Sequence, residues 1–366
     1  QWEQLCGCFD SQPFMSLGFL TAFERTALEA NRLWYVVVQD GLGRPQGCAC
    51  LSRVSLDMLV ISGDAVKSAV RVIRAAVPSF LYVEVLMCGL PFSAGIKHLV
   101  WHPEADGISV LRAIDEAMQA IAQRERIRFL LYKEFHPQDR AVMDGLLQLG
   151  YVAGDSLPGN LFHAEFSSFD EYCSALKAHY RQDIRRSKRK FDSRGYRVKC
   201  LTDSQSIAAA YTDTVHRLYE TKARNAAHSM EVLPALFFME LASELEGTVS
   251  LTCVYQEDEI VAFNWALHAA NDYYFLFCGI DEERNRSGDL YFNLMYQEMD
   301  NALKRKVRNI HFGQTADTFK ARLGCVPVPL YVYVKGLGAF PSRFVSRFSG
   351  FLFGKRLHRP SFRTLR

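Results

Sequence analysis

The stretch VSLTCVYQEDEIVAFNWALHAANDYYFLFCGI, residues 249–280, decides the fold of this chain. Its apolar and β-branched residues fall into three runs, 249–255, 260–268 and 273–279, which are separated by short polar linkers. Runs of this length and composition, bounded by polar residues, are typical of β-strands. Because short linkers join neighbouring antiparallel strands, the stretch predicts a three-stranded antiparallel meander.

Helices and further strands are predicted on both sides of this meander. The basic segment 177–199 carries Leu176, Tyr180, Ile184 and Phe191 at helical spacing, which predicts an amphipathic helix. The other predicted elements are a strand at 197–201, helices at 204–224 and 232–245, and then, after the meander, a helix at 290–306, a strand at 309–312, a helix at 316–323 and a strand at 330–334.

The first half of the chain repeats the end of that order. Its phrase LLQLGYV at 146–152 stands where KARLGCV stands at 320–326, and we interpret the agreement as a degenerate internal duplication. The predicted units are residues 1–160, residues 161–338 and a basic, aromatic tail at 339–366. The elements predicted in the first half are strands at 34–39, 47–53, 80–88, 127–132 and 160–166 and helices at 65–76, 108–124 and 138–149.

Composition limits the class of protein. A chain of 366 residues with 49% hydrophobic and 23% charged residues has enough apolar material for two domains of ordinary size. Its formal net charge of +3 does not by itself indicate a nucleic-acid or membrane partner. The sequence opens without a charged and then apolar leader, and Glu84 interrupts the most apolar stretch, 80–89. We therefore expect a soluble, cytoplasmic protein.

The ten cysteines predict no metal site. The close pairs Cys6/Cys8 and Cys48/Cys50 lack neighbouring histidines and a second pair with zinc-binding spacing. We expect reduced cysteines and no bound metal.

Three phrases of the second half resemble a known family. They are DEYCSALKAHYRQDIRRSKRK at 170–190, YFNLMYQEMDNALKRK at 291–306 and HFGQTADTFKARLGCVPVPLYVYVK at 311–335. They look like the tandem-GNAT family that includes the Fem-type peptidoglycan-bridge transferases and uncharacterised acyltransferases. The phrase LGY at 149–151 is similar to a helix-to-strand junction of the same superfamily. The resemblance implies an α/β fold of two tandem GNAT-like domains, each a mixed, mostly antiparallel sheet flanked by helices, with the first domain degenerate.

The resemblance also implies where an acyl donor binds. The backbone at the end of the strand 273–279 would hold the donor's amide arm, and N–H groups at the start of the next helix would face its phosphates. A side chain at Gly288 would then block the donor and leave the fold intact. Alternatively, Gly279 is only a strand end and Gly288 only a helix cap. The donor-binding candidates are Phe277, Cys278, Gly279, Arg286, Ser287, Gly288 and Tyr291.

The loop before that helix departs from the family pattern. GNAT enzymes typically carry Arg/Gln-x-x-Gly-x-Gly/Ala there, whereas this chain reads RNRSGDL at 284–290. The glycine lies one residue too far from Arg284, and Asp289 would repel a bound pyrophosphate. The donor is therefore expected to be an acyl-CoA or carrier thioester, or alternatively an aminoacyl-tRNA.

Two polar residues are candidates for catalysis. Glu220 could accept the proton of an amine nucleophile, although it could equally be part of a solvated helix face. Asn264 lies within an apolar strand, where it either faces a cleft or is a hydrogen-bonded core amide. Cys278 is more consistent with inert packing than with a nucleophile. The substrate-contact candidates, of which Thr315 could instead cap a helix, are Trp265, Gln314, Thr315 and Lys320.

Charge is concentrated in two places. The basic helix could hold a polyanion such as a tRNA, or be a solvated face. The tail 339–366 alternates basic and aromatic residues and could contact an anionic membrane or dock on the first domain. The family resemblance implies an N-acyltransferase that acts on the amine of a small molecule or amino acid. The alternatives are an aminoacyl-tRNA-dependent, Fem-like transferase and a non-catalytic GNAT-fold binding module.

Overall fold

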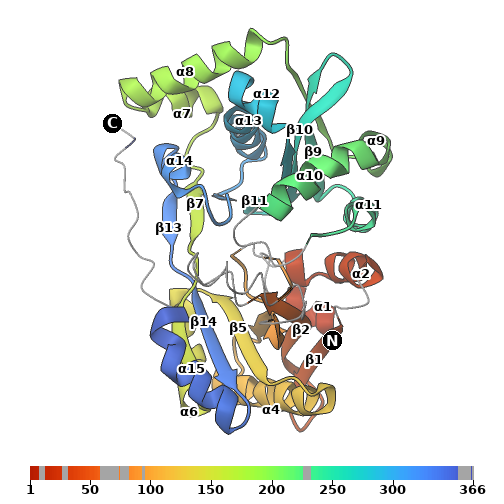
Figure 1. Ribbon diagram of the computed structural model, residues 1–366, viewed down its shortest axis with the longest axis vertical. Coiled ribbons are helices and arrows are strands. Elements are labelled where there is room, and N and C mark those ends of the chain that lie inside the picture. The colour runs from red at the N-terminus through yellow and green to blue at the C-terminus, as the bar shows by residue number, and fades with distance from the viewer. Residues whose placement is uncertain are drawn as a thin grey trace.

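The computed structural model describes residues 1–7, 13–26, 32–57, 74, 82–92, 95–225, 232–352 and 364. Two β-sheets lie one above the other along the long axis of the molecule, with helices packed around each (Figure 1). Within these residues each sheet has seven strands, and each contains one parallel pairing, β3–β5 or β11–β12, among otherwise antiparallel ones. The predicted fold class, a mixed α/β fold with two mostly antiparallel sheets flanked by helices, is confirmed.

The first sheet has the strand order β1-β2-β3-β5-β14-β6, with β4 paired to β2. Its longest helix, α4, begins at the N-cap Asp106, whose carboxylate accepts from the N–H of Ile108, and ends at Arg126 in the left-handed region. The elements of this unit are β1 (Leu33–Gln39), β2 (Pro45–Asp57), β3 (Tyr82–Cys88), β4 (Leu99–Trp101), β5 (Phe129–Phe135), β6 (Val152–Asp155), β14 (Tyr331–Gly336), α1 (Trp2–Gly7), η1 (Pro13–Met15), α2 (Leu17–Thr26), α4 (Gly107–Glu125), η3 (Pro137–Asp139), α5 (Arg140–Met143), α6 (Gly145–Gln148) and α15 (Ala339–Leu352).

The second sheet has the order β13-β7-β12-β11-β10-β9-β8 and contains the predicted meander as β9, β10 and β11. The helix predicted at 204–224 forms two helices, α9 and α10, because Tyr211 and Thr212 interrupt it. The elements of this unit are β7 (Gly159–His163), β8 (Arg197–Leu201), β9 (Val249–Gln256), β10 (Glu259–His268), β11 (Asp272–Ile280), β12 (Asn309–His311), β13 (Val326–Val328), α7 (Phe169–Ala175), α8 (Ala178–Asp192), α9 (Ser204–Ala210), α10 (Asp213–Asn225), α11 (Ala235–Glu244), α12 (Glu282–Gly288), α13 (Leu290–Lys304) and α14 (Asp317–Arg322).

The two units exchange their last strands, a feature that the sequence did not predict. The strand β7 pairs with β12 and β13 of the second sheet, and β14 lies between β5 and β6 of the first. The assignment of the strand at 330–334 to the second sheet is therefore wrong. Short links connect the two sheets: residues 156–158 join β6 to β7, and residues 329–330 join β13 to β14. Because both crossings are hydrogen-bonded ladders, the units cannot separate without breaking strand pairs. The proposed division at residues 160 and 338 stays a prediction.

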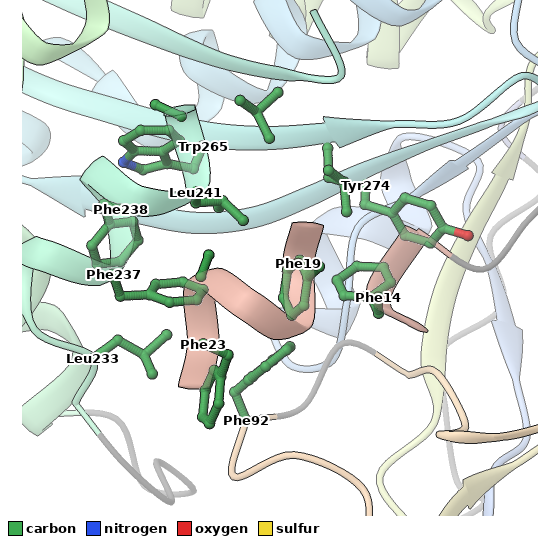
Figure 2. Close-up of a cluster of buried hydrophobic side chains, with 14 of the residues drawn as sticks. Phe14, Phe19, Phe23, Phe92, Leu233, Phe237, Phe238, Leu241, Trp265 and Tyr274 are labelled. Carbon is green, nitrogen blue, oxygen red and sulfur yellow. The ribbon is translucent and has the colours of Figure 1, made fainter. Parts of the chain in front are cut away.

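One hydrophobic cluster also joins the two units (Figure 2). Phe19 and Phe23 of α2 lie with their rings 6.0 and 5.7 Å from that of Phe237 on α11. Trp265 of β10 belongs to the same cluster and is 0% exposed. The prediction that Trp265 contacts a substrate is therefore wrong, because the indole is packed inside the core.

The tail begins with a helix that docks on the first sheet. Helix α15 packs on β14 and β6, with the ring of Phe344 lying 6.4 Å from that of Phe129 and with Val345 buried. Further along, the carbonyl of the buried Thr364 accepts a hydrogen bond from the N–H of Lys177 at 3.0 Å, beside α8 of the second unit. These contacts favour docking as the role of the tail. Within the described part of the chain, no helix is long and apolar enough to cross a bilayer.

Truncation after Gly338 is expected to lower the melting temperature by at least about 5 °C, since removing α15 exposes apolar surface of β14 and β6. Differential scanning calorimetry of the truncated and full-length chains measures this shift. Salt-sensitive binding of the full-length chain to phosphatidylglycerol vesicles, with no change in melting temperature on truncation, would instead assign the tail to a membrane.

Candidate active site

The parallel pair β11–β12 separates at the centre of the second sheet. The two strands pair over three residues and no further, ending at Tyr274 and His311, whereas β10 stays paired with β11 as far as Ile280. Among the described strands, none pairs with the β12-facing side of residues 275–279. An unpaired edge of this kind offers backbone N–H and C=O groups to a bound amide. The predicted donor-arm residues 277–279 lie on this edge.

A turn of left-handed residues takes the chain away from β11 directly after β12. Gly313 and Thr315 have φ values of 67° and 68°. The buried Lys320 fixes the turn, because its Nζ donates to the carbonyls of Phe312 at 2.6 Å and Gln314 at 3.0 Å. The separation of the strands is therefore built into the backbone.

These contacts contradict the prediction that Lys320 and Gln314 bind substrate. Lys320 is 2% exposed and bonds the turn, and Gln314 donates from Nε2 to the carbonyl of Leu157 at 2.7 Å. Both side chains shape the site from within, so the prediction that they contact substrate is not supported. Thr315 stays a prediction.

The corresponding separation in the first unit, between β3 and β5, is filled by the chain itself. The parallel pairing ends at Cys88 and Tyr132. The next residue, Gly89, lies so close to β5 that a Cβ there would meet the Lys133 side chain at 2.9 Å. The Nζ of Lys133 donates to the carbonyl of Phe92, which draws this segment against the end of β5.

A buried carboxylate completes that closure. Glu134 accepts from the N–H groups of Gly95 and Ile96, each at 3.1 Å, and its Oε1 lies 3.6 Å from the Nζ of Lys133. The side chains of Lys133 and Glu134 are 5% and 2% exposed. Burial lowers the pKa of Lys133, and the neighbouring carboxylate opposes this effect. The first unit therefore lacks the open strand edge that the second unit has.

The loop after β11 does not fit a diphosphate. It forms the short helix α12, at whose start the Asp281 carboxylate already accepts from the N–H groups of Glu283 and Arg284. The N–H of Tyr291, in the first turn of α13, donates to Asn285 Oδ1 at 3.0 Å. Side chains thus occupy the amides that a phosphate would use, and one of them, Asp281, is acidic.

The predicted phosphate-facing amides belong to the end of a helix, not to its start. Arg286, Ser287 and Gly288 form the last turn of α12, where backbone N–H groups bond the carbonyls four residues earlier. A Cβ at Gly288 would overlap the ring of Tyr196. The prediction that these amides face phosphates is therefore wrong, as is the expectation that a side chain at Gly288 leaves the fold intact.

The remaining donor candidates surround the open edge. Phe277 packs edge-on against Phe238 at 5.4 Å. Cys278 is half-buried, and burial raises the pKa of its thiol, which agrees with a packing role. Tyr291 packs beside Cys278, with the Nζ of Lys222 4.9 Å above its ring.

The two predicted catalytic residues do not lie in the separation. Glu220 accepts from Arg224 at 3.2 Å as an ordinary helix-surface ion pair. Asn264 is 0% exposed and contacts the buried Glu298 of α13, whose pKa is raised by burial although the hydroxyl of Tyr273 donates to it. Glu220 is thus part of a solvated helix face, whereas the amide atoms of Asn264 are buried without a hydrogen-bond partner among the described residues, so its role stays a prediction.

An aspartate–histidine pair at the point of separation was missed. The Nε2 of His311 lies 2.8 Å from Oδ1 of Asp272, which also accepts from Asn309 Nδ2 at 3.1 Å. The imidazole stacks on Tyr274, with ring centres 4.5 Å apart and planes at 16°. Burial would raise the pKa of Asp272, but the hydrogen bonds from His311 and Asn309 hold it below its usual value. Asp272 and Asn309, each placed two residues before an aromatic ring in a parallel strand, were the available signal.

Helix α8, which packs on α13, carries a cationic surface. Asp183 pairs with Arg186 at 2.8 Å and Asp289 pairs with Lys190 at 2.6 Å, which leaves Arg185 without an ion-pair partner among the described residues. A hollow of about 690 Å³ over this helix is lined by Gln182, Asp183, Arg185, Arg186, Lys188 and Arg189. Among the described residues, no group of three or more His, Cys, Asp or Glu side chains could hold a metal ion.

The family model for the GNAT acetyltransferase domain matches residues 178–321. This segment of the second unit therefore carries a GNAT acetyltransferase domain. Its fold is similar to the crystal structure of FemX, at 12% identity and a TM-score of 0.55 over 95% of this chain and 98% of that one. It is also similar to a tandem GNAT protein from the clavulanic acid biosynthesis pathway, at 14% identity and a TM-score of 0.51 over 87% of each chain. These likenesses establish a tandem-GNAT, Fem-like fold.

A curated Mycobacterium tuberculosis protein is 23% identical over 322 residues and carries the name putative 8-amino-7-oxononanoate synthase 2. The match covers 87% of this chain and 41% of that protein. This chain therefore spans less than half the length of that curated protein.

Proposed function

We propose that this GNAT chain transfers an acyl group from a thioester to a primary amine at the open edge of β11. The observation that supports this site is the separation of β11 from β12 after Tyr274, which leaves residues 275–279 free to pair with the donor's amide arm. The acyl carbonyl would then lie near Tyr274 and His311. N–H groups on the strand edge are suited to stabilising the oxyanion that forms during attack.

The donor is recognised through its amide arm and not through a nucleotide diphosphate. The helix-start amides beside the edge are bonded to Asp281 and Asn285, and Asp289 adds negative charge there. A free acyl-CoA would gain little from its diphosphate, so a thioester on a pantetheine arm should serve as well. The first unit, with its separation closed by Lys133 and Glu134, would have a supporting role only.

Mass spectrometry of transfer from S-acetylpantetheine and from acetyl-CoA to a panel of primary amines tests the proposal. We expect N-acetylated product from both donors, with kcat/KM values within about tenfold of each other. A preference for acetyl-CoA of a hundredfold or more would mean that the loop does bind a diphosphate. Absence of product from either thioester would contradict the proposed function.

The surface of α8 favours a second candidate, aminoacyl transfer from a tRNA. Arg185, Arg186, Lys188 and Arg189 line one hollow and could contact successive phosphates. Changing all four to alanine should then weaken tRNA binding and reduce the log–log salt slope by about one unit per lost phosphate contact. Replacement of Arg112 and Arg128, exposed on the first unit, is the matched control. Product from alanyl-tRNA and from neither thioester would establish this alternative.

A further inference from the structure

We propose that His311 is the general base of this reaction and that Asp272 is its positioning residue. The proposal rests on the proposed function and adds the catalytic group to it. His311 is the last residue of β12 to pair with β11, so it stands where the two strands separate. The acyl end of a donor lying along residues 275–279 would meet the imidazole at that point.

The hydrogen bonds of the pair leave one imidazole nitrogen for a substrate. Nε2 is engaged by Asp272, and none of the described residues bonds Nδ1. The His311 side chain is 26% exposed, whereas that of Asp272 is 10% exposed. Stacking on Tyr274 fixes the plane of the ring, and the hydrogen bond from Asn309 fixes the carboxylate. A base held by a buried carboxylate and exposed at its other nitrogen is arranged for proton transfer.

Several titratable groups lie around His311. The titratable groups that face it are Asp272 and Tyr274 on β11, His163 on β7 through Asn309, and His136 of the first unit. Glu134 of the first unit is linked to the turn after β12, because Gln314 Nε2 in that turn donates to Glu134 Oε1 at 3.5 Å. The carboxylate of Asp272 holds the imidazole through Nε2. Burial lowers the pKa of His136, so that ring stays neutral near pH 7 and does not add a positive charge.

The proposed reaction is a nucleophilic acyl substitution at the thioester carbonyl. The lone pair of an uncharged primary amine attacks the thioester carbonyl carbon, and a proton of that nitrogen passes to Nδ1 of His311. The new C–N bond forms, the tetrahedral intermediate collapses and the C–S bond breaks. The leaving thiolate takes the proton from the imidazolium, which gives amide, thiol and neutral histidine.

The first test compares the pH dependence of acetyl transfer from S-acetylpantetheine in three variants. His311→Gln is expected to lower kcat by about 10²–10⁴-fold, to leave KM for the thioester nearly unchanged and to abolish the acidic limb of the pH profile. Asp272→Asn should lower kcat less and leave KM for the thioester nearly unchanged, because a neutral amide holds the imidazole more weakly than the carboxylate does. His163→Gln is the matched control, since His163 also bonds Asn309 but lies outside the separation.

The second test does not depend on turnover. Diethyl pyrocarbonate should carbethoxylate His311, and S-acetylpantetheine should protect it while leaving the modification of exposed His163 unchanged, as measured by peptide mass spectrometry. If the wild type transfers acetyl groups but His311→Gln retains kcat within about threefold and the same acidic limb, the general-base assignment fails and the proposed function stands. If no transfer occurs and the thioester does not protect His311, both fail.

Discussion

Replacing Glu134 by alanine is expected to destabilise the protein by about 3–5 kcal/mol, because it breaks a buried ion pair and leaves a charged ammonium without its counterion. The carboxylate also accepts the N–H groups of Gly95 and Ile96, which would lose their partner in the same substitution. Urea unfolding followed by circular dichroism measures the loss. The effect should appear in stability and leave the strand edge of the second unit intact.

A second variant separates the charge of Glu134 from its hydrogen bonds, and a surface ion pair provides a control. Glu134→Gln keeps an oxygen that can accept from the two backbone amides and should lose less stability than Glu134→Ala. Asp183→Ala removes an exposed ion pair with Arg186 on α8 and should change stability by less than about 1 kcal/mol. A loss below about 1 kcal/mol for Glu134→Ala would contradict the view that this carboxylate closes the first unit.

Gly279→Ala is expected to cost on the order of 2–3 kcal/mol through overpacking. Helix α10 lies directly on this glycine, so that a Cβ would stand 2.7 Å from the backbone N of Tyr219 and would overlap the ring of Phe263. Neither neighbour is the flexible end of a side chain, so the helix must shift away from β11. Thermal and urea unfolding measure the loss, and acetyl transfer should fall with it because the strand edge moves.

The exposed Gly41 provides the control for Gly279. A Cβ at Gly41 meets nothing within 4 Å, and the residue does not have positive φ, so Gly41→Ala should be neutral within about 0.5 kcal/mol. A stable Gly279→Ala variant that loses only its affinity for the thioester would reassign this glycine to the donor, as the resemblance first implied.

Local patterns predicted the elements but not the sheet to which each strand belongs. The meander at 249–280 and the long helix of 290–306 follow from apolar periodicity and are present as β9–β11 and α13. The exchange of β7 and β14 could not be inferred, because strands of 5 and 6 residues carry the same pattern whichever sheet they join. The polar run after residue 280 was expected to be a loop and is helix α12, since Asp281 caps it. The helix predicted at 65–76 lies outside the described residues except for Arg74.

The strand end was predicted correctly, whereas its role as the donor site stays a prediction. The strand end at 277–279 was located because its position follows from the order of elements. Gly288 and Lys320 were given ligand roles because a sequence does not show that Tyr196 lies on one and that the other bonds its own turn. Asp272 and His311 are 39 residues apart in the sequence, and only the parallel register of their strands brings them together.

Hydrogen exchange of β11 tests the central claim most directly. Amides of residues 275–279 on the unpaired edge should exchange readily in the free protein and be protected when S-acetylpantetheine is bound. The account predicts slower exchange there and at the turn of Gly313, with no change at residues 86–92 of the first unit. Protection confined to residues 86–92, or exchange at 275–279 that is the same with and without saturating thioester, would contradict it.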